Sequence, residues 1–278
     1  MPTRGARARP RLITLSSDVG AAYAAQMKAV LARTIDPARV IELAHDLPAH
    51  GIREAAFVVR AMARGFPAGT VHVVVVDPGV GGRRAPIAIG CRDDSALVGP
   101  DNGVLYPLAQ ALGLGRAHRL EVAHWPSAPD RIGTTFDGRD VFAPAAARLA
   151  EGVPVSALGP PVEPTPLHLE EAERRPNGAS GEIVHVDHFG NLITNVPTSW
   201  VPPRADRIAI AFGRGPLRRY AWVSSYEALG VGRAGLLGSS FGTIELSVAE
   251  GRATDRFRVA AGTRLRFEWP GFDSAGSG

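Results

Sequence analysis

The sequence contains one cysteine, Cys91, and one lysine, Lys28, among its 278 residues. A single cysteine excludes an internal disulfide and a metal site built from several cysteines, and its apolar neighbours suggest a buried thiol. No apolar segment approaches the ~20 residues of a membrane span, and the N-terminus lacks the apolar core of a secretory signal. We therefore expect a soluble, cytoplasmic protein with no membrane partner.

The sequence also lacks a large excess of either charge, because 31 Lys and Arg residues nearly balance 27 Asp and Glu residues and leave a net charge of +4. Nucleic-acid binders gather basic residues on one face and interleave aromatic side chains, whereas the only dense basic run here is residues 3–11. We interpret residues 1–11 as a disordered basic tail, with a nucleic-acid arm as the alternative, and expect no nucleic-acid partner. The histidines lack the paired spacing of a zinc site, so we expect no metal and no cofactor.

The first half of the chain alternates between strand and helix patterns. Short apolar runs rich in β-branched residues are each followed by a polar loop, and two of these loops lead into segments with helical spacing. This alternation predicts a mainly parallel sheet with flanking helices. The predicted strands are residues 12–15, 40–43, 73–76, 87–90 and 96–98, and the predicted helices are residues 21–33, 52–64 and 141–150.

The stretch 71–89, VHVVVVDPGVGGRRAPIAI, organises this half of the chain. Its apolar run suits a strand buried on both faces, and Asp77 stands directly after that run. Open α/β sheets bind ligands outside the carboxyl ends of their strands, which makes Asp77 a candidate site residue. The alternative is a surface hairpin, because Gly, Pro and Asp are also ordinary turn residues.

Two more carboxylates follow predicted strands or begin Gly-rich loops. Asp18 could accept hydrogen bonds from both hydroxyls of a ribose, or it could cap the helix that follows. Asp137 lies in GTTFDGRD before a helix that tolerates Pro144 only in its first turn. The sequence PDNG, at 100–103, favours a plain turn.

The character of the sequence changes after residue 160. Residues 12–160 are expected to form the N-terminal α/β domain, and the proline-rich residues 161–180 are expected to link it to a second domain. Residues 181–270 contain short alternating segments separated by turn residues, which predict a smaller antiparallel β domain, a barrel or a sandwich. Its polar clusters are DHFGN, at 187–191, and GSSFG, at 238–242.

Six segments in order resemble the S-adenosyl-L-methionine hydroxide adenosyltransferases, a family related to the fluorinase and chlorinase. They are SSDVG with YAAQMKAVL, FPAGTVHVVVVDPGVG with RR, PDNG, TTFDGRDVFAPAAARLA, DHFGNLITN and GSSFG. The resemblance implies an N-terminal α/β domain, a C-terminal β domain, and a homotrimer with substrate sites between neighbouring subunits. It also implies that water displaces methionine from C5′ of S-adenosyl-L-methionine to give adenosine, without a cofactor.

The resemblance further implies roles for individual residues. Asp77 matches the carboxylate at the reacting centre, and Arg84 matches its arginine partner. Asp18 matches the residue that holds the ribose hydroxyls. In the C-terminal domain, Asp187 and Ser239 match positions that grip the methionine moiety, Asn191 matches an adenine contact, and Tyr226 is a candidate stacking partner for that base.

One position departs from the family pattern. The family motif TFHGRD carries a histidine where this chain has Asp137, and an ordinary carboxylate is a weaker base than a neutral imidazole. Three hypotheses remain: a working hydrolase with altered pH dependence, an impaired enzyme that still binds substrate, or an enzyme that uses another nucleophile. Halide is the least favoured nucleophile, because Asp77 and Asp137 would repel an anion.

Overall fold

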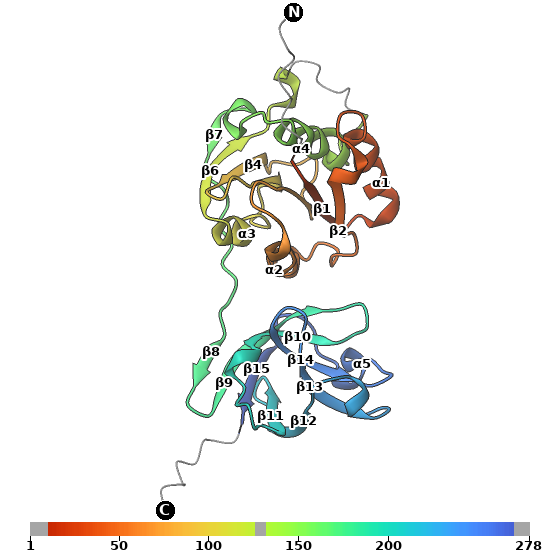
Figure 1. Ribbon diagram of the computed structural model, residues 1–278, viewed down its shortest axis with the longest axis vertical. Coiled ribbons are helices and arrows are strands. Elements are labelled where there is room, and N and C mark those ends of the chain that lie inside the picture. The colour runs from red at the N-terminus through yellow and green to blue at the C-terminus, as the bar shows by residue number, and fades with distance from the viewer. Residues whose placement is uncertain (1–10, 126–131, 270–278) are drawn as a thin grey trace, which may run out of the picture. The chain divides into compact units, whose positions relative to one another are not determined.

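The computed structural model describes residues 11–125 and 132–269, and the chain divides into two compact units, residues 1–168 and 169–278. Figure 1 shows that each unit is built around its own sheet. All but one residue of the expected basic tail, and residue 270, lie outside the described residues.

The first unit contains a seven-stranded sheet in the order β2-β1-β3-β5-β4-β6-β7. Neighbouring strands from β2 to β5 are parallel, and the pairs from β5 to β7 are antiparallel. The strands are β1 (Ile13–Ser17), β2 (Val40–Ala44), β3 (Val71–Val75), β4 (Pro86–Cys91), β5 (Ala96–Pro100), β6 (Leu114–Arg119) and β7 (Pro161–Val162). The strands that precede Asp18 and Asp77 are β1 and β3, and both belong to the parallel part of the sheet.

Helices cover this sheet on both sides (Figure 1). They are α1 (Gly20–Leu31), α2 (Ile52–Met62), α3 (Tyr106–Ala111) and α4 (Ala143–Ala150). Helices α1 and α4 pack together and share a core with β1 and β3, whereas α2 packs against α3. Pro144 lies in the first turn of α4, as predicted.

Strands β3 and β4 do not form the hairpin that their closeness in sequence allowed. Strand β5 lies between them, parallel to β3 and antiparallel to β4. Residues 76–85 therefore pass over the end of β5 instead of making a tight turn. This corrects the surface-hairpin interpretation, because a tight turn requires two adjacent antiparallel strands.

The second unit is an eight-stranded sheet in the order β10-β14-β13-β12-β11-β15-β9-β8. Strand β9 also pairs with β10, so all strands except β8 close into a barrel. Every pair is antiparallel apart from β12 and β13. The elements are β8 (Glu173–Arg175), β9 (Gly178–Val186), β10 (Leu192–Pro197), β11 (Arg207–Phe212), β12 (Arg218–Trp222), β13 (Ala234–Gly238), β14 (Thr243–Val248), α5 (Ala253–Phe257) and β15 (Arg264–Glu268).

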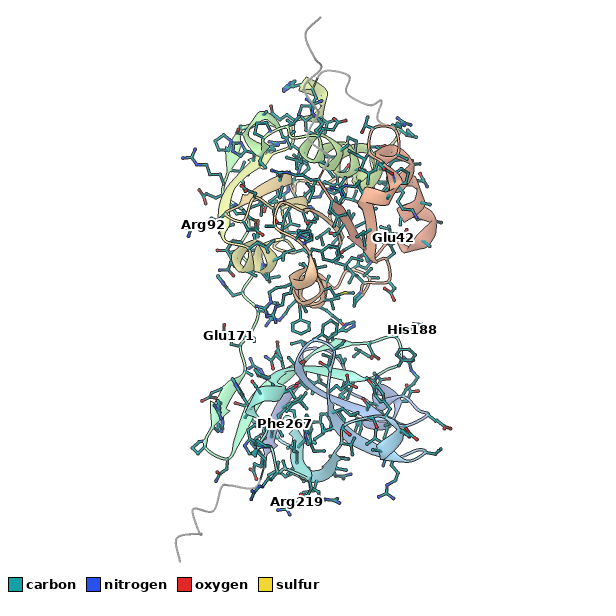
Figure 2. The ribbon with its side chains drawn as sticks, in the orientation of Figure 1. Glu42, Arg92, Glu171, His188, Arg219 and Phe267 are labelled. Carbon is teal, nitrogen blue, oxygen red and sulfur yellow. The ribbon has the colours of Figure 1, made fainter. Side chains whose placement is uncertain are left out.

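The barrel interior is apolar and its outer surface is charged. Phe267 is 1% exposed and belongs to the core, whereas Arg219 projects outward from β12 (Figure 2). This alternation of apolar and polar side chains is what a half-buried strand requires. The predicted fold class, an α/β domain followed by a β domain, is confirmed.

The stretch expected to be a linker, residues 161–180, contains regular structure. Strand β7 pairs with β6, β8 pairs with β9, and β9 begins at Gly178. Prolines do not exclude these pairings, because β7 lies at a sheet edge where a missing N–H is tolerated. Along the chain, the first unit ends at His168 and the second begins at Leu169. Cys91, expected to be buried, is only partly buried at the end of β4.

Candidate functional site

The first cluster of candidate site residues lies beyond the end of β3. Asp77 follows the buried strand by two residues, and its side chain is only 6% exposed. Arg84 lies on the returning part of the same loop, and its side chain is 11% exposed. The glycines and Pro78 give this loop the sharp turns that bring residues 77 and 84 face to face.

Arg84 joins the carboxylates of Asp77, 7 residues before it in sequence, and Asp137, 53 residues after it. Its Nε donates to Asp77 Oδ1 at 2.9 Å, and its Nη2 donates to Asp77 Oδ2 and to Asp137 Oδ2, the latter at 2.5 Å. The guanidinium also lies 5.7 Å from the centre of the Phe142 ring. Asp77 and Asp137 therefore share one cation, which offsets their mutual repulsion.

The electrostatics of this cluster follow from its burial and charge count. Burial by itself would lower the pKa of Arg84, but its hydrogen bonds to Asp77 and Asp137 outweigh that effect and raise the pKa. The arginine therefore stays charged. Two carboxylates and one guanidinium carry a formal charge of −1, which makes the cluster attractive to a cation and unfavourable for an anion.

Asp137 is placed by an irregular helix start. It directly precedes a π-helical turn, Gly138–Phe142, that runs into α4, and its side chain is 4% exposed. Such turns often occur at functional sites, because they redirect side chains without breaking the helix. A Cβ at Gly138 would lie 2.7 Å from the Phe136 ring, so only glycine fits in this turn.

Asp140 and Arg139 hold the loop before this turn. Arg139 Nε donates to Asp140 Oδ1 at 2.7 Å, and its Nη1 donates to Gln26 on α1. The hydrogen bond to Arg139 lowers the pKa of Asp140, with further help from backbone N–H groups of Gly133 and Ile132. A carboxylate that receives these donors fixes the backbone that leads to Asp137.

Asn102 belongs to this site, although the sequence indicated only a turn. Its Nδ2 donates to the carbonyl of Val76 at 2.9 Å, directly before Asp77, and its Oδ1 accepts from Val104 N at 3.1 Å. The side chain therefore fixes the backbone beside Asp77. The signal available in the sequence was PDNG itself, but no local spacing indicates a contact 26 residues away.

Asp18 is not the helix cap that the alternative interpretation required. Helix α1 begins after Val19 without a side-chain cap, and Asp18 Oδ2 accepts from His50 N at 3.1 Å. Asp18 N donates to the carbonyl of Val75 at 3.2 Å. Asp18 is therefore anchored beside the end of β3, on the strand adjacent to the one that leads to Asp77.

The second cluster of candidate residues lies in the barrel. Asp187 Oδ1 accepts from Asn191 N at 2.8 Å, and its Oδ2 accepts from Asn191 Nδ2 at 2.9 Å, so the turn after β9 holds the two side chains together. Ser239 Oγ lies 3.1 Å from Thr243 Oγ1 across the turn between β13 and β14. Each polar cluster of the sequence therefore forms a turn that side-chain hydrogen bonds hold together.

A row of polar side chains on strand β14 lies between the turn that holds Asp187 and the turn that holds Ser239. Thr243, Glu245 and Ser247 alternate with the apolar residues Ile244, Leu246 and Val248, so they share one face of the strand. Leu192, next to Asn191, pairs with Leu246, and Thr243 contacts Ser239. Glu245 and Ser247 were not predicted as site residues, although the alternation TIELSV places them on one face of a strand.

Tyr226 joins this row through its hydroxyl. Tyr226 Oη donates to Glu245 Oε1 at 2.5 Å, and the side chain is 52% exposed. Partial burial, then the hydrogen bond to Glu245, and the nearby charges of Glu245 and Asp187 raise the pKa of Tyr226. The hydroxyl therefore remains protonated and donates at neutral pH.

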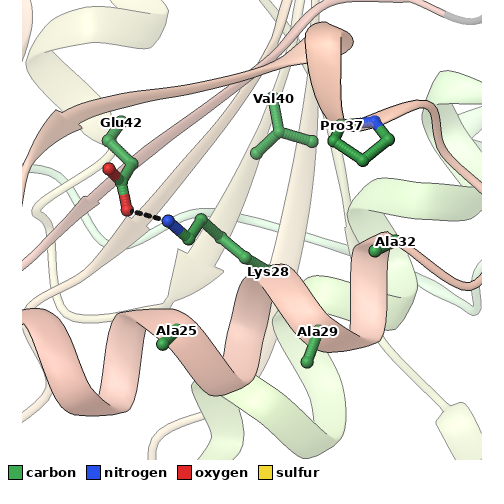
Figure 3. A pocket seen from close by; sticks show the side chains of 7 residues that line it. All are labelled: Ala25, Lys28, Ala29, Ala32, Pro37, Val40 and Glu42. Atoms are coloured by element: carbon green, nitrogen blue, oxygen red, sulfur yellow. Dashed lines mark ion pairs between the residues drawn. The ribbon is translucent and has the colours of Figure 1, made fainter.

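A groove lies outside both clusters, between α1 and the edge strand β2 (Figure 3). It encloses about 380 Å³, and Lys28 Nζ and Glu42 Oε1 form an ion pair of 2.6 Å across it. Its remaining lining is mostly small and apolar: Ala25, Ala29, Ala32, Pro37 and Val40. No candidate site residue lines it.

In residues 11–125 and 132–269, no group of three or more His, Cys, Asp or Glu could hold a metal ion. In the same ranges, no helix is long and apolar enough to cross a membrane.

Comparison with family models decides the family. The model of the SAM hydroxide adenosyltransferase N-terminal domain matches residues 13–159, and that of the C-terminal domain matches residues 181–266. The chain belongs to the SAM hydroxide adenosyltransferase family. The predicted resemblance is confirmed, and both clusters lie within the matched ranges.

Several relatives of this SAM hydroxide adenosyltransferase family member have curated names. A protein of Salinispora tropica named (R)-S-adenosyl-L-methionine hydrolase is 38% identical over 260 residues, covering 91% of this chain and 96% of its own. The protein of the same name from Thermus thermophilus is 37% identical over 260 residues, covering 88% and 93%. A fluorinase of Actinopolyspora mzabensis is more distant, at 26% identity over 214 residues, covering 66% and 71%.

Solved structures share the fold. An uncharacterized conserved protein of Thermotoga maritima has a TM-score of 0.82 at 29% identity, covering 92% of this chain and 100% of its own. A conserved hypothetical protein of Thermus thermophilus has a TM-score of 0.71 at 33% identity, covering 92% and 99%. The two-unit architecture is therefore shared along nearly the whole chain.

Proposed function

We propose that this protein hydrolyses S-adenosyl-L-methionine to adenosine and L-methionine. The observation that carries the proposal is the buried cluster of Asp77, Arg84 and Asp137, in a chain of the SAM hydroxide adenosyltransferase family. The Salinispora tropica and Thermus thermophilus relatives, which are named as hydrolases, match more of its length, at higher identity, than the Actinopolyspora mzabensis fluorinase does.

The chemistry needs little acid catalysis. A water oxygen forms a bond to C5′ while the C5′–S bond breaks, and the sulfur keeps the electron pair and leaves as the neutral thioether of methionine. The attacking water must lose one proton, which passes to a carboxylate of the cluster and then to solvent. The protein's main tasks are therefore to align one water with C5′ and to accept that proton.

The charge of the cluster fits this reaction. Arg84 offsets one of the two carboxylates and leaves one negative charge, which attracts the sulfonium and can take up the proton. The same charge repels a halide ion. We therefore favour water as the nucleophile, and a halide-using adenosyltransferase remains the less favoured alternative.

Asp137 is the unusual member of the catalytic set that we propose. It stands in the position where the family motif has histidine, and here it hydrogen-bonds Arg84. We propose that Asp77 orients the water and that Asp137 takes part in removing its proton. The competing hypothesis is a protein that binds S-adenosyl-L-methionine or adenosine with impaired turnover, and the substitution at residue 137 is the observation that favours it.

The remaining candidate residues are assigned to substrate binding. We propose that Asp18 accepts the ribose hydroxyls, that Asn191 contacts adenine, and that Tyr226 stacks on it. Asp187 and Ser239 would hold the amino and carboxylate groups of the methionine moiety. The hydrogen bonds between Asp187 and Asn191 support this division, because they fix two binding side chains in one turn.

We also propose a homotrimer, with substrate between neighbouring subunits, in the cytoplasm and without a cofactor. The support is the family resemblance, together with the division of candidate residues between two separate units. Sedimentation velocity at several protein concentrations tests the assembly, and a monomer that turns over substrate would contradict it.

One assay tests the reaction. Purified protein is incubated with S-adenosyl-L-methionine, with and without added halide, and products are separated by liquid chromatography. Adenosine and methionine in equal amounts are expected. Failure to form either product would overturn the hydrolase, and adenosine binding measured by calorimetry in the same sample would then support the binding protein. Halogenated adenosine would instead support halide as the nucleophile.

A further inference from the structure

Glu245 is a buried carboxylate that receives two hydroxyl donors. Its Oε1 accepts from Tyr226 Oη at 2.5 Å and from Ser247 Oγ at 2.9 Å, and the residue is 3% exposed. Tyr226, in contrast, is 52% exposed. The three residues therefore form a chain of contacts from the buried polar row on β14 to an aromatic ring at the surface.

The position of Glu245 is costly for stability alone. A buried carboxylate loses its hydration, and within residues 11–125 and 132–269 no ion pair with an Arg, Lys or His compensates it. An apolar residue would suit a buried strand better. The presence of a carboxylate at position 245 is therefore better explained by its hydrogen bond to the Tyr226 hydroxyl than by a contribution to folding.

The loop that carries Tyr226 has another anchor. Leu229 is 6% exposed and packs with Leu237 and Ala249, and a Cβ at Gly235 would overlap its side chain. The short helix that starts at Glu227 is thereby fixed to the barrel without the tyrosine hydroxyl. The hydrogen bond to Glu245 adds a different constraint: it fixes the direction of one exposed ring.

We propose that Glu245 and Ser247 are positioning residues that hold the Tyr226 ring ready to receive the adenine base. The proposal rests on the proposed function, because it takes the adenosyl group as the ligand. Holding a side chain in its bound orientation removes an ordering cost from binding. Ser247 donates to the same oxygen of Glu245 and so fixes the direction of that carboxylate.

A double-mutant cycle tests this coupling. Tyr226→Phe and Glu245→Met are made singly and together, and adenosine binding is measured by calorimetry. Each single variant should weaken adenosine binding about fivefold, which is the cost of ordering one side chain. The double variant should be no weaker than Tyr226→Phe, because the same contact has already been lost. Additive effects, or an unchanged affinity in Glu245→Met, would overturn the proposal.

Kinetics and a conservative variant separate positioning from folding. In Glu245→Met the KM for S-adenosyl-L-methionine should rise about fivefold while kcat stays the same, because the contact acts on binding. Glu245→Gln keeps an acceptor oxygen and should restore much of the affinity; equal weakening in Gln and Met variants would count against the hydrogen bond. Glu268→Met, at an exposed position on β15, and Tyr220→Phe, on β12, are the matched controls.

A spectroscopic readout checks the contact without substrate. The hydrogen bond and the charge of Glu245 contribute to raising the pKa of Tyr226, so an ultraviolet titration of Glu245→Met should show one tyrosine ionising at lower pH. That change should be absent when Tyr226→Phe is also present. Wild-type protein that binds no adenosine would overturn this proposal and the substrate assignment together. Wild-type protein that binds adenosine but forms no product would overturn the reaction alone.

Discussion

Arg84 Nη2 lies 2.5 Å from Asp137 Oδ2, and the same nitrogen also donates to Asp77. A single guanidinium therefore connects Asp77, on the loop after β3, with Asp137, which directly precedes the π-helical turn before α4. An aspartate at residue 137 changes the local charge, and Arg84 offsets that change. Predictions about activity and stability follow from this geometry.

Removal of the guanidinium should destabilise the protein. Arg84→Met leaves Asp77 and Asp137 buried together without a cation, which should cost about 3–5 kcal/mol of unfolding free energy and abolish turnover. Urea denaturation measures the change. The double variant Arg84→Met with Asp137→Asn should recover part of the stability, because one buried charge is gone. A double variant no more stable than Arg84→Met would contradict the shared ion pair.

Replacement of Asp137 by histidine should change the pH dependence of catalysis. An imidazole accepts a proton only when it is neutral, and its ordinary pKa is about 6.5. The kcat/KM of Asp137→His should therefore rise with pH through about that value, with higher activity above it than the wild-type protein has. Asp137→Asn, which cannot accept a proton, is the control and should lose about a hundredfold in kcat. A profile for Asp137→His identical to that of the wild type would show that residue 137 does not handle the proton.

Gly81 should be needed for the approach of the two loops. It has φ = +74°, and a Cβ there would lie 2.7 Å from the Thr134 carbonyl oxygen, three residues before Asp137. Gly81→Ala should therefore separate the loops and reduce kcat about a hundredfold. Gly69→Ala is the matched control, because Gly69 has φ = +81° and nothing within 4 Å of its Cβ position.

Both glycine variants should lose about 1 kcal/mol of stability, since an L-residue resists positive φ. Only Gly81→Ala should lose activity beyond that common effect. Equal kcat values for the two variants, measured at a temperature where both are folded, would show that the contact with Thr134 does not position the site.

His72 should make the stability of the first unit sensitive to mild acid. Burial, opposed in part by the charge of Asp93, lowers the pKa of His72 to about 4 from 6.5, and its Nδ1 lies 2.9 Å from Thr14 Oγ1. Between those pH values the unfolded chain binds a proton that the folded protein does not. Stability is therefore fully present above the unfolded pKa and decreases as the pH falls, by about 2 kcal/mol from about pH 7.5 to about pH 5.

The variant His72→Gln should remove this pH-dependent difference, because glutamine does not titrate. Denaturation at the two pH values measures it, with His124→Gln as the control, since that side chain is 75% exposed. Parallel losses of stability in His72→Gln and the wild-type protein would assign the acid sensitivity to other groups.

Much of the fold could be predicted because its elements carry local signals. The runs that became β1 and β3 are apolar and β-branched, and α2 has helical spacing, so burial and periodicity indicate them without tertiary information. Strands β6, β12 and β13 lack such a signal. Strands β6 and β12 carry exposed arginines, and β13 contains two glycines, so pairing with neighbouring strands decides their conformation.

The sequence by itself determined the family, the order of the two units, and the carboxylates that end strands or begin Gly-rich loops, because these depend on motifs and short-range spacing. Only the tertiary structure decided that β5 separates β3 from β4, that Asn102 holds the backbone before Asp77, and that Glu245 underlies Tyr226. It also decided that Arg84 bridges Asp77 and Asp137. The physical reason is that hydrogen bonds and ion pairs depend on distances in space, and strand pairing brings together residues whose separation in sequence gives no sign of contact.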